Sequence, residues 1–303
     1  MTHREPMPEP NESKEGRQRR PQSFPSSKGG LLALVATPIG NLGDISARAL
    51  ETLREADLIA CEDTRVTGNL LSKFEIRRPT LPYHDHNAET MRPKLMERLL
   101  HGETVALVSD AGMPLINDPG YKLVRAATEA GIAVTVIPGP SAPLAALVLS
   151  GLPSDRFLFA GFLPIKDGAR RETLLELKLV PATLLFFETG PRLADSLATC
   201  ADVLGDRPAA VARELTKLHE EVRRDTLGAL ARHYAESGAP KGEIVVVIGP
   251  PLPEEQAFDV DAALTTALQS MAVKEAAAAI AVASGRPRRE IYARALALSG
   301  RKP

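Results

Sequence analysis

The segment at residues 104–120 constrains the fold of this chain more than any other. It opens with residues 104–108 (TVALV), an apolar run that predicts a buried central strand of a parallel sheet. The polar stretch 109–120 follows, and it is longer than a tight turn between a strand and a helix requires. In open α/β sheets, ligands bind beyond the carboxyl ends of the strands. The sequence therefore predicts an α/β fold with Asp110 where a ligand would bind.

Two interpretations of residues 109–120 stand side by side. Asp118 and Pro119 have the pattern of an N-cap and a first helical residue, which predicts a helix from there to about residue 130. A plain loop with a capped helix explains these two residues. It explains Asp110, Gly112 and Met113 less well. The second interpretation is a ligand site, because a glycine lets the backbone approach a bound molecule closely.

Similar turns follow the other predicted strands of this region. Strand 31–36 leads into Pro38 and two glycines, strand 57–61 into Glu62, Asp63 and Arg65, strand 80–83 into residues 84–87, and strand 132–137 into residues 138–142. Ser141 is predicted to cap the next helix, which is a sufficient structural role. The repetition of polar and glycine-containing turns, rather than any one of them, favours a shared pocket.

The cluster His84, Asp85, His86 and Asn87 contains groups suited to catalysis, RNA contact or metal binding. On an extended segment the two histidines would point in one direction and Asp85 in the other, and no third ligand is placed by the sequence. We therefore expect no metal. Glu62 and Asp63 beside Arg65 form either a surface ion network or a base next to an anion-binding group.

Composition limits the class of protein. A chain of 303 residues that is 44% hydrophobic is long enough for two packed domains. The sequence contains neither an apolar run of about 18 residues nor the apolar core of a signal peptide, so a cytoplasmic protein is expected, with no membrane contact. Cys61 and Cys200 are far apart, which predicts buried thiols rather than a disulfide framework.

Four regions are predicted along the chain. Residues 1–29 read as a disordered tail, 30–150 as the first α/β domain and 151–250 as a second α/β domain with mostly antiparallel strands, closed by strand 243–249. Residues 251–303 read as three helices, the last two forming a helix-turn-helix-like hairpin around Gly285. From residue 271 to 303 there are seven Lys or Arg against two acids, which favours an anionic partner.

Seven segments together resemble the tetrapyrrole methylase family of S-adenosylmethionine-dependent methyltransferases. They are residues 37–44, 61–65, 84–87, 109–120, 138–142, 187–189 and 212–217. The resemblance implies two α/β domains of the tetrapyrrole methylase type, with the cofactor cleft between them, and a small C-terminal helical module. It also implies a homodimer.

The same resemblance implies methyl transfer from S-adenosylmethionine to the 2′-hydroxyl of a cytidine ribose in small-subunit (16S) ribosomal RNA, free or in the 30S subunit. Residues expected to bind the cofactor are Pro38, Asp110, Gly112, Met113, Ser141, Ala142 and Phe187. Candidates for the base that removes the hydroxyl proton are His84, Glu62 and Asp63. Imidazole exchanges a proton near neutral pH, so His84 is the first candidate, with RNA phosphate contact as its alternative.

Two other functions stay open. Methylation of a small tetrapyrrole or a protein side chain uses the same fold, but such substrates would not require the basic C-terminal module. A non-catalytic RNA-binding protein is the third possibility, and the dense polar groups at the strand ends argue against it.

Overall fold

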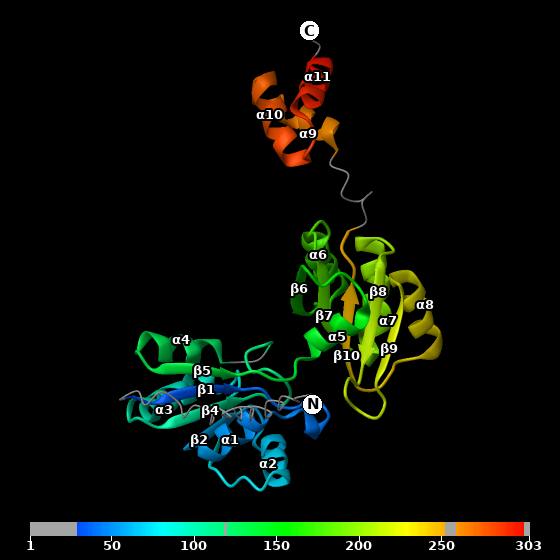
Figure 1. Ribbon diagram of the computed structural model, residues 1–303. Coiled ribbons are helices and arrows are strands. Elements are labelled where there is room, and N and C mark those ends of the chain that lie inside the picture. The colour runs from blue at the N-terminus through cyan, green and yellow to red at the C-terminus, as the bar shows by residue number, and fades with distance from the viewer. Residues whose placement is uncertain (1–28, 118–119, 252–258, 300–303) are drawn as a thin grey trace, which may run out of the picture. The chain divides into compact units, whose positions relative to one another are not determined.

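The computed structural model describes residues 29–117, 120–251 and 259–299 (Figure 1). The chain divides into two compact units, one made of residues 1–145 and Leu215–Leu218, the other of residues 146–214 and 219–303. Helix α5 (Ala142–Ser150) contains the first division point. The predicted tail up to residue 28 and the predicted cap at Asp118 and Pro119 lie outside the described residues.

The first unit contains a five-stranded parallel sheet in the order β3-β2-β4-β1-β5. Its strands are β1 (Leu31–Val35), β2 (Leu58–Cys61), β3 (Thr80–Pro82), β4 (Thr104–Val108) and β5 (Ala133–Ile137). The prediction that residues 104–108 form a central strand is confirmed, because β4 lies between β2 and β1. All five carboxyl ends therefore meet at one edge of the sheet.

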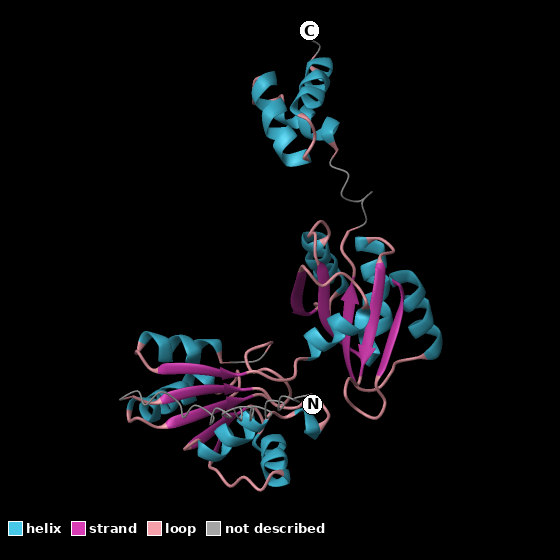
Figure 2. Ribbon diagram, in the orientation of Figure 1, coloured by secondary structure: helices cyan, strands magenta, loops and turns pink. Residues whose placement is uncertain are grey.

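Helices cover both faces of this sheet (Figure 2). Successive side chains of a strand point to opposite faces, and β4 accordingly supplies Val108 to one core and Leu107 to the other. The first core includes residues of α1 (Ala47–Glu55) and α2 (Thr64–Lys73). The second includes residues of α3 (Ala88–Leu100) and α4 (Tyr121–Glu129).

Helix α2 begins at Thr64, directly after the turn that follows β2. Its N-cap is Asp63, whose Oδ1 accepts a hydrogen bond of 2.8 Å from the backbone N–H of Arg65. A carboxylate at this position satisfies a backbone donor that the helix itself leaves unpaired. Its position beside Glu62 and Arg65 makes Asp63 a candidate for catalysis in the sequence, and this capping role is visible only in the structure.

The second unit contains a mixed sheet in the order β6-β7-β10-β8-β9. Its strands are β6 (Phe157–Phe162), β7 (Thr183–Thr189), β8 (Pro208–Arg213), β9 (Glu221–Thr226) and β10 (Glu243–Ile248). Three pairings are antiparallel and only β6 with β7 is parallel, which confirms the mostly antiparallel prediction. Strand β10 was expected to close the sheet but lies at its centre, consistent with burial of all its residues after Glu243.

One core of this unit joins the sheet to three helices. They are α6 (Asp167–Leu177), α7 (Gly190–Leu204) and α8 (Leu227–Ser237). Asp167 in the first turn of α6 pairs with Arg170 and Arg171. Cys200 of α7 is buried in this core and Cys61 in that of the first unit, as expected of structural thiols.

The C-terminal helices are α9 (Val260–Ala267), α10 (Val273–Ser284) and α11 (Arg288–Leu298). They pack around a small core of their own. Gly285 ends α10 in the left-handed conformation, with φ of 64°, as the glycine stop in the sequence predicted.

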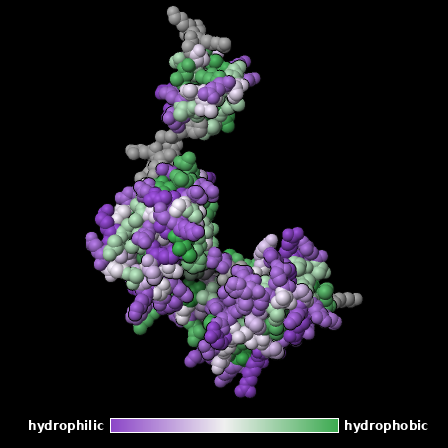
Figure 3. Space-filling model, turned by 180° about the vertical axis from the view of Figure 1, so that it is seen from behind, coloured by the Kyte–Doolittle hydropathy of each residue, from purple (hydrophilic) through white to green (hydrophobic). Residues whose placement is uncertain are grey.

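On the face drawn in Figure 3, hydrophilic side chains predominate and hydrophobic ones appear in small groups. Within the described part of the chain, none of the helices has both the length and the apolar character needed to cross a membrane.

Candidate functional site

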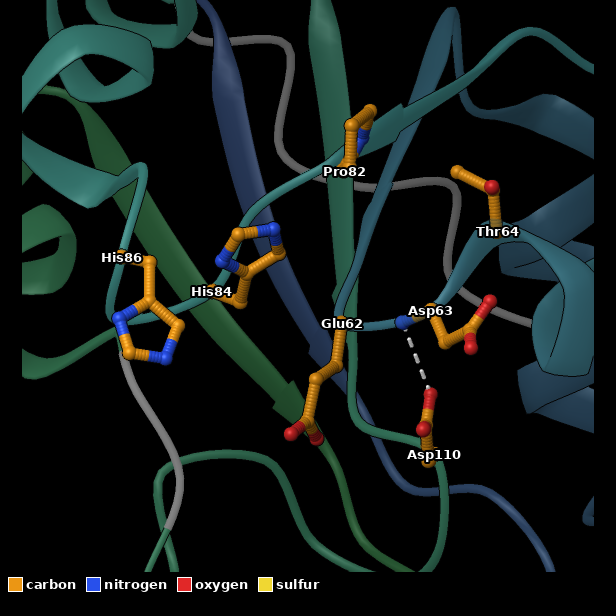
Figure 4. Close-up of a pocket in the computed structure, with 7 residues that line it drawn as sticks. All are labelled: Glu62, Asp63, Thr64, Pro82, His84, His86 and Asp110. Carbon is orange, nitrogen blue, oxygen red and sulfur yellow. Dashed lines mark hydrogen bonds between the residues drawn. The ribbon is translucent and has the colours of Figure 1, made fainter.

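A pocket of about 440 Å³ opens at the carboxyl ends of β2, β3 and β4 in the first unit. The residues that line it are Glu62, Asp63, Thr64, Pro82, His84, His86 and Asp110 (Figure 4). The structure thus brings together the three predicted base candidates and Asp110. The turns after β2, β3 and β4 therefore share a pocket, whereas no residue of the turns after β1 and β5 lines it.

The two histidines reach the pocket from a tight turn, not from an extended segment as predicted. Asn87 closes this turn: its Oδ1 accepts a 2.9 Å hydrogen bond from the N–H of His84, and its Nδ2 donates one of 2.9 Å to the carbonyl of Pro82. The rings of His84 and His86 lie edge to face, with centroids 6.0 Å apart. Asp85 is exposed and does not line the pocket.

His84 is the better placed of the two histidines for proton transfer. It is half-buried, whereas His86 is exposed. Its Nδ1 is buried and makes no hydrogen bond within the described protein. Buried polar atoms are normally paired, so this unpaired nitrogen is unusual, and the residue itself lines the pocket. In Figure 4 the Glu62 side chain points away from that of Asp63.

Asp63 is committed to structural contacts. Its Oδ2 lies 2.6 Å from Nη2 of Arg65, in addition to the cap of α2. The hydrogen bonds from Arg65 lower the pKa of Asp63 to about 2. A carboxylate that binds protons so weakly is a poor base near neutral pH. The surface-network interpretation therefore fits Asp63, while Glu62 and His84 remain as base candidates.

Asp110 lines the same pocket from the loop that follows β4. The Oδ1 atom of Asp110 accepts a 3.0 Å hydrogen bond from the backbone N–H of Asp63. Among the described residues, no second group donates a hydrogen bond to the Asp110 carboxylate. Partial burial raises the pKa of Asp110, and the Asp63 hydrogen bond partly offsets that effect. The fixed carboxylate thus keeps oxygen lone pairs for a ligand.

The loops after β1 and β4 are joined by backbone hydrogen bonds. The N–H of Thr37 donates to the carbonyl of Gly112 at 2.9 Å, and the N–H of Gly112 donates back to Thr37 at 3.1 Å. Gly112 has φ of 80°, and a Cβ there would lie 3.2 Å from Ile39 Cγ2 and 3.4 Å from the carbonyl oxygen of Pro140. This position therefore requires glycine, and three strand-end loops meet around it.

The remaining residues predicted to bind the cofactor do not line the pocket. Pro38, Gly112, Met113, Ser141 and Ala142 follow β1, β4 and β5 in the first unit. Phe187 is on β7 in the second unit, where it packs against Phe159 and Phe162. Their role in cofactor binding stays a prediction.

In the sequence, family resemblance is all that singles out Thr216 and Lys217. Both belong to the segment that is grouped with the first unit. Thr216 Oγ1 accepts a 3.1 Å hydrogen bond from the N–H of Asn41, and a Cβ on Gly40 would lie 2.4 Å from Lys217 Cγ. These contacts fix the loop after β1. Thr216 has φ of 66°, an unusual value for a β-branched residue, and the sequence carries no sign of it.

Comparison with known proteins agrees with this architecture. The family of Tetrapyrrole (Corrin/Porphyrin) Methylases matches residues 31–231, and the RsmI C-terminal HTH domain matches residues 254–299. Two similar proteins are both named ribosomal RNA small subunit methyltransferase I. The one from Mesorhizobium japonicum is 55% identical over 269 residues, 88% of this chain and 92% of the relative. The one from Escherichia coli O157:H7 is 45% identical over 283 residues, 92% and 99% of the two chains.

Solved structures show the same fold at lower identity. A uroporphyrin-III-C-methyltransferase from Thermus thermophilus aligns with a TM-score of 0.53 at 21% identity, over 73% of this chain and 94% of that one. A diphthine synthase aligns with a TM-score of 0.54 at 21% identity, over 73% of this chain and 90% of the diphthine synthase chain. From its matched residues and its relatives, the chain belongs to the tetrapyrrole (corrin/porphyrin) methylases, a family of methyl-transferring enzymes.

Proposed function

We propose that this chain transfers a methyl group from S-adenosylmethionine to the ribose 2′-hydroxyl of a cytidine in small-subunit ribosomal RNA. The observation that carries the proposal is similarity over nearly the whole chain to proteins named ribosomal RNA small subunit methyltransferase I. It includes the C-terminal helices, which a methylase of small molecules would not need. The polar pocket of the first unit supplies groups for the reaction.

The strand-end loops of the first unit suit the methyl donor. Asp110 offers carboxylate oxygens to its hydroxyl or amino groups, and the crowded glycine position 112 lets the backbone approach it. We assign Pro38, Met113, Ser141 and Ala142 to the same group from the family resemblance. When bound, S-adenosylmethionine would supply an electrophilic methyl group on a sulfonium.

The chain itself has two tasks in the reaction: to orient the ribose and to accept a proton. Positioning alone can contribute on the order of 7 to 11 kcal/mol to such a step. We assign proton removal to His84, which lines the pocket and whose backbone is fixed by Asn87. Glu62 is the second candidate, because it lines the same pocket.

The C-terminal module supplies cations for RNA. Arg286 pairs with Glu290 and Arg294 with Asp261. Arg288 and Arg289 are exposed at the start of α11 and form no ion pair within the described residues. They can therefore contact phosphates. The homodimer and the cytoplasmic location suggested by the sequence stay predictions.

The test compares substrate classes directly. Purified protein and labelled S-adenosylmethionine are incubated with small ribosomal subunits from cells lacking the enzyme, with transfer RNA and with the free ribosomal proteins. We expect label only in the RNA of the small subunit. Alkali cleaves RNA through a free 2′-hydroxyl, so label in an alkali-resistant dinucleotide would support ribose methylation. Label in protein, or none with donor binding intact, would contradict the proposal.

A further inference from the structure

Three phenylalanine rings form a group on the second unit. The Phe187 ring on β7 lies 4.9 Å from that of Phe159 and 5.4 Å from that of Phe162, measured between centroids, and both contacts are inclined. Phe159 and Phe187 are half-buried, whereas Phe162 is 48% exposed. An exposed ring beside two partners is a ready stacking surface.

A β-bulge creates this group. Phe159 is opposite Leu185 and Phe162 is opposite Phe187, so three steps along β6 match two steps along β7. Without the bulge, Phe159 and Phe162 would point to opposite faces of the sheet. Leu158 and Ala160 pack on the core below α6, α7 and α8, and regular alternation would send Phe162 there too. The bulge, with Gly161 at φ of 65°, instead exposes Phe162.

The chain directly after Phe162 is held by arginines. Arg192 donates to the carbonyl of Leu163 at 2.5 Å, and Arg170, itself buried, donates to that of Ile165 at 3.4 Å. Arg192 Nε also lies 3.3 Å from the buried carboxylate of Glu188. Hydrogen bonds from two guanidinium groups to two carbonyls of this loop keep the segment in one conformation.

Lys166 follows in the same segment. It is exposed at the N-cap of α6, and no ion pair of Lys166 exists within the described residues. An exposed aromatic ring followed four residues later by an available cation is the combination that single-stranded nucleic acid requires, with the ring for a base and the cation for a phosphate.

We propose that Phe162, supported by Phe187, stacks on a base of the RNA substrate, with Lys166 contacting an adjacent phosphate. This inference rests on the proposed function. It assigns a substrate-binding surface to the second unit, separate from the polar pocket of the first. Unstacked bases of RNA commonly pack on aromatic side chains in this way.

Kinetics of Phe162→Leu provide the first test. We expect the KM for small subunits to rise about 10-fold, while the KM for S-adenosylmethionine stays unchanged and Phe162→Tyr restores the wild-type value. Phe157→Leu is the matched control, because Phe157 is 46% exposed at the opposite end of the same strand. If wild-type protein methylates subunits and Phe162→Leu has a normal KM for them, this inference is wrong and the proposed function stands. If wild-type protein does not methylate them, the proposed function itself fails.

Fluorescence provides a second test that does not depend on activity. The chain has no tryptophan, so Phe162→Trp and Phe157→Trp each carry a single reporter. Protein-free small-subunit RNA is expected to quench Phe162→Trp and to leave Phe157→Trp unchanged. Quenching of Phe162→Trp by S-adenosylhomocysteine alone would assign the ring to the adenine of the donor and overturn the inference. Equal thermal midpoints of the variants and wild type show that the fold is intact.

Discussion

The carboxyl ends of the strands carry different chemistry in the two sheets. In the parallel sheet of the first unit they lead to Glu62, His84 and Asp110 around one pocket. At the parallel pair β6 and β7 of the second unit they carry Phe162 and Phe187, next to a loop whose carbonyls accept hydrogen bonds from Arg170 and Arg192. The first arrangement has groups suited to proton exchange and to accepting hydrogen bonds, whereas the second offers an apolar surface. The comparison leads to the proposal that reaction chemistry and substrate contact are divided between the units.

The comparison is tested most severely at Asp110. Replacing Asp110 with Ala is expected to abolish donor binding, with affinity for S-adenosylhomocysteine at least about 100-fold weaker, because hydrogen bonds to a charged group contribute about 1.5 to 3 kcal/mol each. Isothermal titration calorimetry measures this loss. Phe162→Leu serves as the control from the other unit and should bind normally. Unchanged affinity in Asp110→Ala would remove the donor from this edge of the sheet.

In the second unit the largest effect is expected at Glu188. Its carboxylate is buried and accepts hydrogen bonds from Ser196 Oγ at 2.6 Å and the N–H of Thr189 at 2.8 Å. Glu188→Ala leaves these donors and Arg192 without their partner, so we expect a loss of about 3 kcal/mol in the free energy of unfolding. Urea denaturation measures it, with exposed Glu172→Ala on α6 as the control. An equal midpoint for both variants would show that this network does not hold the loop after β6.

A pH dependence sharpens the contrast between Asp110 and Asp63. Burial raises the pKa of Asp110, whereas Arg65 holds that of Asp63 at about 2. Ionised Asp110 therefore costs stability, and protonation as the pH falls through its raised pKa adds stability. Donor affinity should fall over the same range, because the protonated group is a weaker acceptor. Calorimetry at several pH values should show this bend above pH 3.8, the ordinary value. A bend that persists in Asp110→Asn would assign it to another group.

The smallest effect is expected at Arg65. Its side chain is 87% exposed, and exposed ion pairs contribute little to stability. Arg65→Ala should therefore leave the thermal midpoint unchanged, whereas Asp63→Ala, which also removes the cap of α2, should lower it. A large destabilisation by Arg65→Ala would mean that the Asp63 network is more than a surface feature.

Much of the architecture follows from local sequence pattern. The run at residues 104–108 predicts the central strand because five apolar residues in succession suit a strand buried on both faces. Gly285 predicts the end of α10 because glycine adopts the left-handed conformation readily. Polar residues after successive parallel strands predict the shared pocket, since those ends meet at one edge.

The rest depends on contacts that no local pattern encodes. In the sequence, Asp63 fits both a helix cap and a catalytic base. The structure favours the cap, because the Asp63 carboxylate contacts both the backbone N–H and the guanidinium of Arg65. The turn at His84 is closed by Asn87, which a strand pattern does not reveal. The bulge that exposes Phe162 arises from its register with β7, a strand more than 20 residues away.

The most direct measurement of the central claim is nuclease mapping of the methylated product. Small subunits from cells lacking the enzyme are labelled by the purified protein and S-adenosylmethionine, and the RNA is digested to oligonucleotides with a base-specific ribonuclease for mass spectrometry. The account predicts label on the ribose of one cytidine with wild-type protein, and none with Asp110→Ala. Label on a base, or equal labelling by Asp110→Ala, would contradict it.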